Sequence, residues 1–333
     1  MRIGLVGVGR IGAFHAATLA ALPAVDQVVV TDADPERARV VAKELEVWFA
    51  PDVDALLGSG LDGFVICAAT SAHAELIGQG LAAGVTTFCE KPLAPDLAGT
   101  QAAVRAVEAG GVPVQIGFQR RFDAGYRAAA TAVHNGDLGW IHTIRANTGD
   151  AAPPPAEYIP TSGGFFRDCN VHDFDALRFV TGREVVSVYA TGANRGEAFF
   201  AASGDVDSAA ALLTLDDDTF VTVNGTRYNG AGHDVRMEIL GSSGSLAVGL
   251  DDHAALKSAE QGVTFPAGPS HGTFMDRFRA AYVAELTAFT EVVAGAREVP
   301  CTVRDALEAF RIAEACEISR RENRPVRLDE VGR

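Results

Sequence analysis

The sequence is poor in basic residues. Its 333 residues include 28 Lys and Arg against 43 Asp and Glu, which gives a formal net charge of -15 at pH 7. Nucleic-acid binding depends on Lys and Arg side chains that replace counterions on the phosphates, and anionic membrane surfaces attract the same side chains. The charge balance therefore argues against both kinds of partner.

Long hydrophobic runs are also absent. Residues 1–6 contain one basic side chain, and the chain reaches Gly7 too early to form the apolar core of a signal peptide. No later apolar run approaches the roughly 20 residues of a membrane-spanning helix. We therefore expect a cytoplasmic protein that makes no contact with a membrane.

Cysteine is scarce, and its positions show no paired spacing. An odd number of scattered cysteines fits reduced thiols in a cytoplasm better than a disulfide framework. The five positions are Cys67, Cys89, Cys169, Cys301 and Cys316. Internal repeats and low-complexity tracts are absent too, so we expect an ordinary globular protein.

Two segments of different texture make up the chain. Up to Phe118, short apolar runs alternate with helical stretches, a pattern typical of a parallel sheet covered by helices on both faces. The expected strands are 2–6, 27–31, 63–67, 86–89 and 112–116, with a weaker one at 48–49, and the expected helices are 11–21, 35–45, 72–83 and 96–109.

After Phe118 the chain turns to longer β-rich stretches. A helix at 124–135 and a strand at 141–147 precede a loop rich in Pro and Gly, 149–164, and a helix at 171–181. The following runs, joined by short turns, indicate an antiparallel meander: 185–191, 208–215, 220–226, 235–240 and 245–248, with closing helices at 278–294 and 303–321. We therefore predict an α/β protein with domains at 1–118 and 119–333.

The turn after the first strand reads Gly7-Val8-Gly9-Arg10-Ile11-Gly12 and opens the first helix. In a dinucleotide-binding turn, the first glycine allows the tight bend, the second lets a pyrophosphate approach the backbone, and the third lets helix and strand pack. The amides of the helix N-terminus then face the phosphates. A plain β–α turn would also use glycine, but the strand before and the helix after favour a cofactor cradle.

Asp32 lies at the end of the second expected strand, twenty residues beyond Gly12. An acid at this place binds the hydroxyls of the adenosine ribose and repels a ribose phosphate. Ala33 follows it, and the nearest basic side chain, Arg37, lies a turn into the next helix. The spacing favours NAD over NADP, the alternative being that Asp32 simply forms a turn.

The tripeptide Glu90-Lys91-Pro92 puts two opposite charges directly after the apolar run 85–89. Open α/β sheets bind their ligands outside the carboxyl ends of their strands, so Lys91 is well placed for chemistry. The alternative is a surface lysine after a strand that stops at Pro92.

Asp168 and His172 are four residues apart at the start of an expected helix, so they can share one face. A histidine that titrates near neutral pH suits a general base, and a neighbouring carboxylate can fix its tautomer and stabilise its charged form. The alternatives are a helix cap for Asp168 and a metal site that includes Cys169. We expect no metal, because no second Cys or His stands at the spacing of a zinc site.

In combination, these motifs resemble those of the Gfo/Idh/MocA oxidoreductases. The resemblance rests on the order and separation of the glycine turn, Asp32, Glu90-Lys91-Pro92 and the Asp168–His172 pair, and it extends to residues 117–123 and 149–155. Within the family, the chain is most similar to the myo-inositol 2-dehydrogenases.

The resemblance implies an N-terminal Rossmann domain and a C-terminal α/β domain with a large, mainly antiparallel open sheet. It also implies a homotetramer assembled through that sheet and a cis peptide bond between Lys91 and Pro92. The implied cofactor is NAD, bound by Gly7, Gly9, Arg10, Ile11, Gly12, Asp32, Ala69, Thr70, His73, Glu90 and Lys91.

The implied activity is oxidation of a secondary alcohol on a cyclic polyol, with myo-inositol oxidised to 2-keto-myo-inositol (scyllo-inosose). His172 would take the hydroxyl proton, Asp168 would orient His172, and Lys91 would bind the reacting oxygen. The residues implied in substrate binding are Lys91, Arg120, Asp150, Asp168, His172 and Tyr228. The alternatives are another inositol, an amino-cyclitol or another sugar, an elimination that recycles NAD, and a catalytically silent NAD-binding regulator.

Overall fold

The computed structural model describes residues 1–332 of the chain. They form two compact units: a first unit of Met1–Gln119 with Ala280–Leu307, and a second unit of Arg120–Arg279 with the chain from Glu308 onward. The boundary expected after Phe118 lies close to this division. The segment Ala280–Leu307, which the sequence assigns to the second domain, belongs to the first unit.

Among the described residues, the first unit is built around six strands in the order β3-β2-β1-β4-β5-β6. Neighbouring strands are parallel throughout, and the order is that of a Rossmann fold. The strands are β1 (Arg2–Val6), β2 (Gln27–Thr31), β3 (Trp48–Phe49), β4 (Gly63–Ile66), β5 (Thr86–Glu90) and β6 (Val114–Gly117). The predicted Rossmann domain is confirmed.

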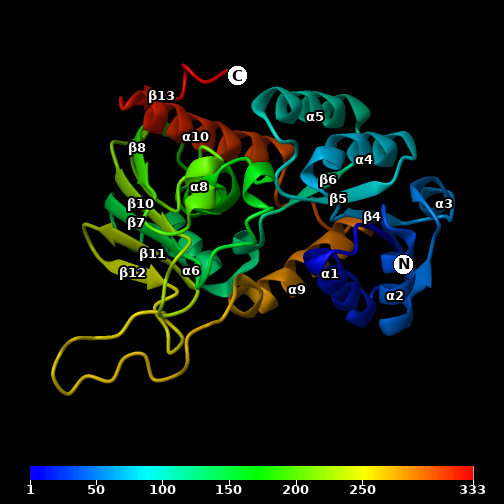
Figure 1. Cartoon of the computed structure of the whole chain (residues 1–333), viewed down its shortest axis with the longest axis horizontal. Helices are drawn as coiled ribbons and strands as arrows, with labels where there is room; N and C mark the ends of the chain where they lie inside the picture. Colours follow the sequence, from blue (N-terminus) through cyan, green and yellow to red (C-terminus); the bar gives the residue numbers. More distant parts are fainter. Residues whose placement is uncertain (333) are drawn as a thin grey trace. The chain divides into compact units, whose positions relative to one another are not determined.

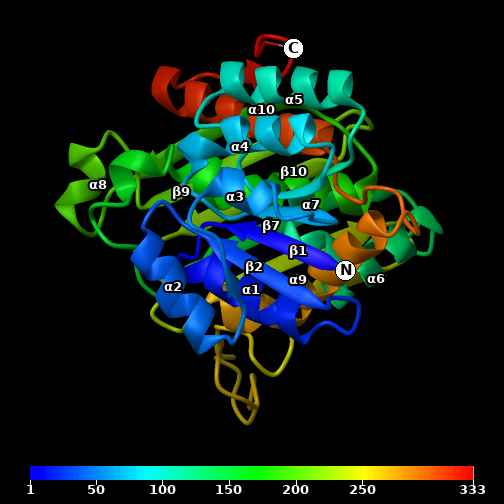
Figure 2. The same ribbon diagram turned by 90° about the vertical axis from the view of Figure 1, so that its right-hand side faces the viewer.

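Helices cover both faces of this sheet. Figures 1 and 2 show α4 (Thr70–Ala82) and α5 (Leu97–Gly110) on one face, with α1 (Arg10–Ala21), α2 (Pro35–Glu44) and α9 (Phe274–Val293) on the other. One buried core joins the sheet to α1, α2 and α9, through residues such as Leu5, Ala16 and Phe289. A short helix, α3 (Val53–Leu57), was not expected.

Local sequence sets the helix starts. Asp34 accepts backbone hydrogen bonds at the N-terminus of α2, where Pro35 takes the first helical position, and Asp96 caps α5 in the same way. At the start of α1 the capping position is Gly9, and no side chain caps that helix. The capping residue therefore supplies no side-chain acceptor to the first backbone N–H groups of α1.

Within residues 1–332, the second unit holds seven strands in the order β12-β11-β7-β10-β9-β8-β13. They are β7 (Ile141–Gly149), β8 (Val185–Ala193), β9 (Ser208–Leu215), β10 (Phe220–Thr226), β11 (Asp234–Gly241), β12 (Ser245–Val248) and β13 (Val326–Arg327). The sheet is mainly antiparallel, as predicted, but β7 and β10 pair in parallel. The predicted simple meander is wrong at this point, because β7 lies between β10 and β11.

Helices α6 (Ala124–His134), α7 (Val171–Thr181) and α10 (Val303–Glu322) pack on this sheet. Shorter helical turns are η1 (Gln119–Phe122), η2 (Ile159–Thr161), η3 (Phe166–Asn170) and α8 (Ala198–Ala202). In the part of the chain that the structure describes, no helix combines the length and the apolar character needed to cross a membrane.

One face of the sheet carries exposed apolar side chains. Tyr189 of β8 lies opposite Leu212 of β9, and Phe220 of β10 lies opposite Thr214, which shares the face of Leu212. The apolar members of this set, Tyr189, Leu212 and Phe220, are all exposed. Such a surface marks an interaction site more often than a solvated face.

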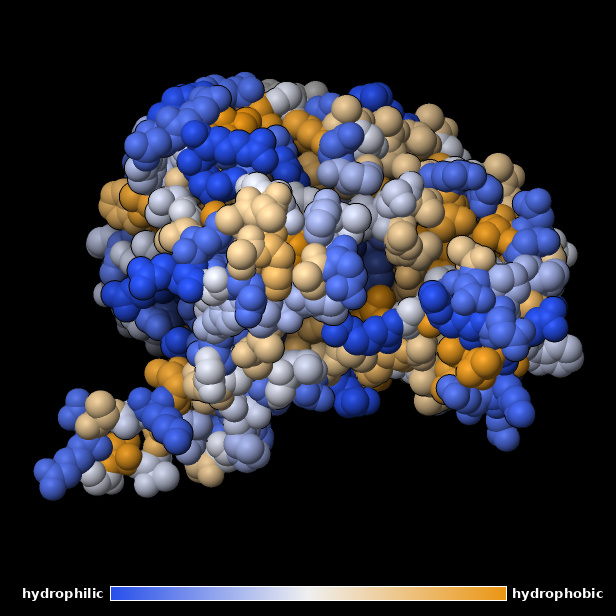
Figure 3. Space-filling model, viewed as in Figure 1, coloured by the Kyte–Doolittle hydropathy of each residue, from blue (hydrophilic) through white to orange (hydrophobic). Residues whose placement is uncertain are grey.

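A long loop, residues 249–273, connects β12 to α9. Figures 1 and 2 show it extending away from the strands of the second unit. Figure 3 shows a mixture of hydrophilic and hydrophobic residues on this extension, with Leu250 and Val263 about half exposed.

Candidate active site

The glycine turn between β1 and α1 has the geometry of a phosphate cradle. Gly7 adopts a φ of +92°, and a Cβ there would lie 2.5 Å from the backbone N of Ala68. A Cβ on Gly12 would lie 1.8 Å from the carbonyl oxygen of Gly7, so this glycine lets the helix pack against the turn. Gly9 differs, because a Cβ there would meet no protein atom within 4 Å. The space in front of Gly9 is open to a ligand that approaches the backbone.

This turn fits a dinucleotide. Arg10 and Ile11 begin α1, where no side chain caps the backbone N–H groups. Those groups carry partial positive charge and suit a pyrophosphate. The open space at Gly9 supplies the room that a phosphate needs.

Asp32 directly follows β2, and its carboxylate lies beside the cradle. Its Oδ2 accepts a hydrogen bond from the backbone N of Val8 at 2.7 Å, and its Oδ1 accepts one from the backbone N of Asp34 at 2.9 Å. A carboxylate has further lone pairs for ribose hydroxyls. Arg37 is closer than its sequence position suggests, with Nη1 3.6 Å from Oδ1 of Asp32.

The N-terminus of α4 follows β4 at the same edge of the sheet. Ala69 is its capping residue and Thr70 its first residue. His73, expected near the cofactor, is buried, and both ring nitrogens face backbone carbonyls: Nδ1 lies 2.7 Å from that of Pro92, and Nε2 lies 3.0 Å from that of Ala68. The ring therefore connects two loops of the protein itself.

Lys91 and Pro92 follow the last residue of β5, Glu90, at the carboxyl end of the sheet. Their peptide bond is cis, as the resemblance implies. The side chain of Lys91 is half-buried. This is the strand end where an open α/β sheet binds its ligand.

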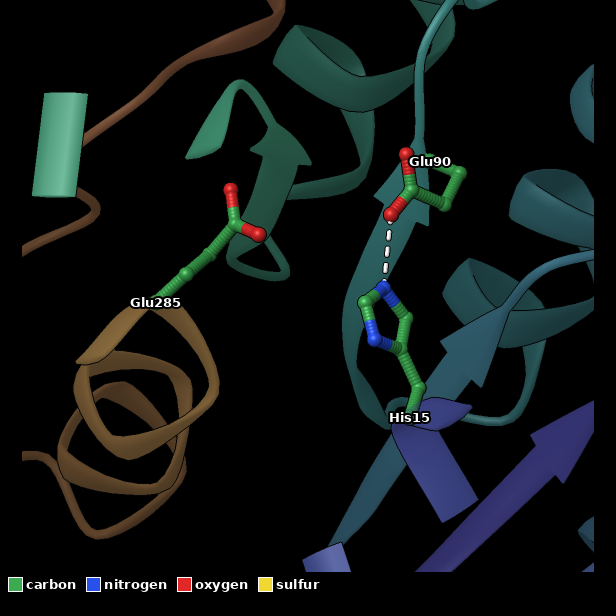
Figure 4. A group of neighbouring side chains, drawn as sticks. All are labelled: His15, Glu90 and Glu285. Atoms are coloured by element: carbon green, nitrogen blue, oxygen red, sulfur yellow. Dashed lines mark hydrogen bonds and ion pairs between the residues drawn. The ribbon is translucent and has the colours of Figure 1, made fainter. Parts of the chain in front are cut away.

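A buried histidine binds Glu90. Figure 4 shows His15, from α1, pointing at Glu90, with Glu285, from α9, directed toward the same pair. Nε2 of His15 lies 2.6 Å from Oε1 of Glu90, and one ligand atom from each of the three residues falls within a 4.8 Å group. Two ligands of a tetrahedral zinc ion are about 3.3 Å apart, given bonds of about 2.0–2.1 Å. The 2.6 Å contact between His15 and Glu90 is shorter than this and is that of a hydrogen bond. The three residues therefore fit a hydrogen-bonded pair, His15 and Glu90, beside the carboxylate of Glu285.

A second polar group, the Asp168 cluster, lies in the second unit. Oδ2 of Asp168 accepts a hydrogen bond from Nη2 of Arg227 at 2.6 Å, and its Oδ1 accepts one from the hydroxyl of Tyr158 at 2.8 Å. Nη1 of Arg227 donates to Oδ2 of Asp150 at 3.1 Å, and Nδ1 of His233 lies 3.4 Å from Oδ1 of Asp150. The side chain of Arg227 is 5% exposed, so water screens these charges little.

Strand pairing gathers this cluster at one end of the sheet. In the parallel pair, Thr226 of β10 lies opposite Gly149 of β7. Arg227 and Asp150 therefore leave neighbouring strands side by side. Strand β11 begins opposite the same Gly149, so His233, the residue before it, lies at the same end.

The charges of the cluster shift its pKa values. Burial alone would raise the pKa of Asp150, but the hydrogen bond from His233 and the charge of Arg227 lower it below its usual value. Burial works to lower the pKa of Arg227, and the neighbouring Cys169 and Asp168 raise it above its ordinary range. At neutral pH the cluster therefore contains an ionised Asp150 beside a charged guanidinium.

Asp168 lies in a single π-helical turn, Phe166–Asn170, that leads into α7. Turns of this kind occur often at functional sites. The capping position of α7 is Asn170, so the alternative that Asp168 is a simple helix cap is wrong. His172 lies in the first turn of α7 and is half-buried.

Two residues expected to bind substrate have other partners. Arg120 is buried, forms an ion pair with Asp173 of α7, and donates from Nη2 to the hydroxyl of Thr148 at 3.0 Å. The hydroxyl of Tyr228 accepts a hydrogen bond from the backbone N of Glu197 at 3.0 Å. These polar atoms thus bind other parts of the second unit.

Three members of the cluster, Tyr158, Arg227 and His233, were not expected from the sequence. The run of polar residues just after β10, where Arg227 directly precedes Tyr228, could have indicated Arg227 as a site residue. Their convergence on Asp150 and Asp168 depends on the parallel pairing of β7 and β10, which no local pattern indicated.

Comparisons with known proteins cover nearly the whole chain. The oxidoreductase family with an NAD-binding Rossmann fold matches residues 1–118, and the GFO/IDH/MocA C-terminal domain matches residues 126–247. A myo-inositol dehydrogenase of Streptomyces leeuwenhoekii is 39% identical over 322 residues, which cover 96% of this chain and 97% of that protein.

Solved structures of inositol dehydrogenases are also similar to this chain. The fold is similar to that of a myo-inositol dehydrogenase from Corynebacterium glutamicum, with a TM-score of 0.90, 33% identity and 98% of both chains covered. It is also similar to a scyllo-inositol dehydrogenase from Lactobacillus casei with bound NAD(H) and scyllo-inositol, with a TM-score of 0.87, 28% identity and 99% of both chains covered.

The two family matches fall on the two halves of the chain, and the cradle, Asp32 and Lys91 all lie in the NAD-binding half. The chain belongs to the Gfo/Idh/MocA oxidoreductases, and it is an NAD-dependent dehydrogenase.

Proposed function

We propose that this enzyme oxidises a secondary alcohol of a cyclic polyol, converting myo-inositol to 2-keto-myo-inositol (scyllo-inosose). The observation that carries the proposal is the Asp168 cluster, which combines carboxylates, an imidazole and a phenol around a buried guanidinium, with Tyr158 exposed at its edge. A polyol presents several hydroxyls, each a donor and an acceptor, and such a mixed set of groups can bind them. The similarity to inositol dehydrogenases over the whole chain supports the substrate class.

In the proposed reaction His172 is the general base and takes the proton of the substrate hydroxyl. Asp168 orients His172 and stabilises its charged form, while Arg227 and Tyr158 fix Asp168 through bonds of 2.6 and 2.8 Å. Lys91 donates a hydrogen bond to the reacting oxygen and stabilises its developing negative charge. The glycine turn and Asp32 would hold NAD, which would supply the acceptor for the hydride that the carbinol carbon loses.

Other residues bind the rest of the substrate in this proposal. Asp150 and His233 are assigned to further hydroxyls, because Nε2 of His233 is buried with no hydrogen-bond partner in the described part of the chain. Arg120 supports the start of α7 through its ion pair with Asp173. Tyr228, 37% exposed, is assigned to the outer edge of the substrate site.

Replacement of His172 tests the proposed base. H172A should lower kcat for myo-inositol by about 10²–10⁴-fold, the usual contribution of a general base. The Kd for NAD should stay nearly unchanged, because the cradle residues lie in the first unit. Unchanged turnover in H172A would refute the assignment.

The substrate has a test of its own. NADH formation is followed with myo-, scyllo- and chiro-inositol, an amino-cyclitol and simple aldoses. The highest kcat/KM with myo-inositol supports the proposal, and a clear preference for another compound reassigns the substrate. Consumption of substrate without accumulation of NADH would indicate an elimination that recycles NAD. Tight NAD binding without reduction by any compound would favour a silent regulator.

We also propose that the protein is a cytoplasmic homotetramer. The support for assembly is the exposed apolar set Tyr189, Leu212 and Phe220 on one sheet face. Light scattering on the wild-type protein and on L212E tests it. A smaller species in L212E, with NAD binding retained, is the expected result, and a wild-type monomer would contradict it.

A further inference from the structure

Lys91 stands between two residues that buried histidines bind. His15, on α1, binds the side chain of Glu90, the residue before the lysine. His73, on α4, binds the backbone carbonyl of Pro92, the residue after it, at 2.7 Å from Nδ1. The two histidines are 0% and 1% exposed, so water competes little for either bond. The backbone of Lys91 is thereby fixed on both sides.

The His15 ring is held in one orientation (Figure 4). It packs edge-on against Phe88, with ring centroids 5.8 Å apart, and lies tilted against Tyr282 at 5.5 Å. Its Nδ1 is buried without a hydrogen-bond partner among residues 1–332, which assigns the ring proton to Nε2, where it donates to Glu90. Glu90 also packs closely on Gly117, where a Cβ would lie 3.1 Å from the Cδ of Glu90.

His73 connects the Lys91 loop to the cofactor cradle. Its Nε2 lies 3.0 Å from the carbonyl oxygen of Ala68, and a Cβ on Gly7 would lie 2.5 Å from the N of the same Ala68. Both partners of the ring are carbonyl oxygens, so a ring nitrogen binds either of them only by donating, and a neutral ring, which carries one N–H, donates to one of them at a time. The ring thus spans the loops that follow β4 and β5.

We propose that His15 and His73 are positioning residues for Lys91. The inference rests on the function proposed above for Lys91. One histidine comes from the helix that begins at the cradle, and the other binds a residue packed on the cradle, so both fix the lysine relative to the cofactor-binding turn. A displacement of about 1 Å in a group that meets the reacting atoms can lower turnover about 100-fold. Buried anchors on the residue before the lysine and on the residue after it oppose such a displacement.

Matched variants separate hydrogen bonding from packing. A Gln amide places its N–H near the position of Nε2, so H15Q can keep the bond to Glu90, whereas H15L cannot. An Asn amide places its N–H near the position of Nδ1, so H73N can keep the bond to Pro92. H73Q keeps only the bond to Ala68.

We expect H15L and H73Q to lower kcat for the polyol by about 10–100-fold. H15Q and H73N should stay within about threefold of the wild-type kcat, because each retains the donor that matters. The Kd for NAD should change little in all four variants, since none alters the glycine turn or Asp32.

A direct readout on Lys91 does not depend on turnover. The chain contains three lysines, Lys43, Lys91 and Lys257, and Lys43 and Lys257 are exposed. Selective labelling of lysine with ¹³C at Cε gives three resonances, and K91R identifies that of Lys91. In H15L and H73Q this resonance should move toward those of the two exposed lysines, whereas in H15Q and H73N it should keep its wild-type position.

Equal losses of kcat in H15L and H15Q, or in H73Q and H73N, would overturn the inference, because packing alone would then explain them. An unmoved Lys91 resonance in H15L and H73Q would overturn it as well. If H15L fails to fold, H15N takes its place, since the shorter amide cannot reach Glu90. A wild-type enzyme that binds NAD but oxidises no polyol would refute the proposed function alone, because the resonance still reports the position of Lys91.

Discussion

Removal of the buried guanidinium of Arg227 tests the electrostatics of the Asp168 cluster. R227M keeps the apolar stem and deletes the charge of a side chain that is 5% exposed. Asp168 and Asp150 then lose donors at 2.6 and 3.1 Å. Breaking a buried ion pair from one side costs about 3–5 kcal/mol, because the remaining charge is left uncompensated at low dielectric. Asp150 is 22% exposed, so water relieves part of the cost, and we expect about 3 kcal/mol.

The second unit offers a matched control. Arg145 also forms an ion pair, with Nη1 3.0 Å from Oε2 of Glu238, but these side chains are 57% and 37% exposed. Exposed pairs contribute about 0–1 kcal/mol. For a unit of roughly 150–250 residues, 3 kcal/mol corresponds to a fall in Tm of about 6–12 °C. R145M should lower Tm by about 4 °C at most.

Differential scanning calorimetry at neutral pH compares the wild type, R227M and R145M. The double variant D168N/R227M, compared with the single variants D168N and R227M, adds a further check. Removal of the Asp168 charge relieves part of the destabilisation that R227M causes, so the losses of stability in the two single variants should sum to more than the loss in the double variant. A stability of R227M within about 1 kcal/mol of that of R145M would refute the reasoning. So would strict additivity in the double variant.

Three further predictions concern the cofactor and pH. Gly9→Ala should weaken NAD binding with little loss of Tm, whereas Gly12→Ala, whose Cβ would lie 1.8 Å from a carbonyl oxygen, should lower Tm even without NAD. Calorimetry with and without NAD separates the two effects. A strongly destabilised Gly9→Ala variant would contradict the open space that the structure shows in front of Gly9. Asp32→Ser should raise the ratio of kcat/KM for NADP to that for NAD by about tenfold or more, because it removes a carboxylate that repels the ribose phosphate. It also releases Arg37 from its 3.6 Å contact with Asp32. An unchanged ratio would contradict the role of Asp32 in selecting NAD. The pKa of Asp150 is lowered from its usual 3.8, so its ionised form stabilises the fold above that value, and this contribution is lost as pH falls through the lower folded pKa. Asp150→Asn should therefore destabilise at neutral pH and approach the wild type at pH values well below 3.8, measured as urea midpoints; equal differences at both pH values would exclude this role.

The Rossmann half could be predicted because its signals are local. Parallel strands are buried on both faces and read as continuous apolar runs, as in β1, β2, β4 and β5. Asp34 and Asp96 mark helix starts through bonds within the same turn. The spacing of Gly7, Gly9 and Gly12 reflects contacts between residues close in sequence, such as that of Gly12 with Gly7. The cofactor cradle could therefore be predicted from the sequence alone.

The sequence did not predict that a late segment, Ala280–Leu307, belongs to the first unit. Leu286 and Phe289 of α9 are buried in the core of the first unit, and the helix itself was predicted. The apolar stripe of an amphipathic helix shows that it covers a sheet, but not which sheet. Assignment of Ala280–Leu307 to the second domain followed from sequence order alone.

Two of the five residues in the Asp168 cluster were predicted, and the other three were missed for a related reason. Asp168 was predicted from its spacing to His172, and Asp150 was predicted through the family resemblance. A meander, however, would have set β10 beside β11 and left Asp150 without a reason to meet Arg227. The insertion of β7 between those strands, with Gly149 opposite Thr226, brings the two residues together. A slip of one residue between β7 and β10 would move Asp150 away and leave the buried guanidinium with one carboxylate where it now has two. Because a buried charge without its partner is costly, the same strand register that builds the sheet also sets the charge balance of the site.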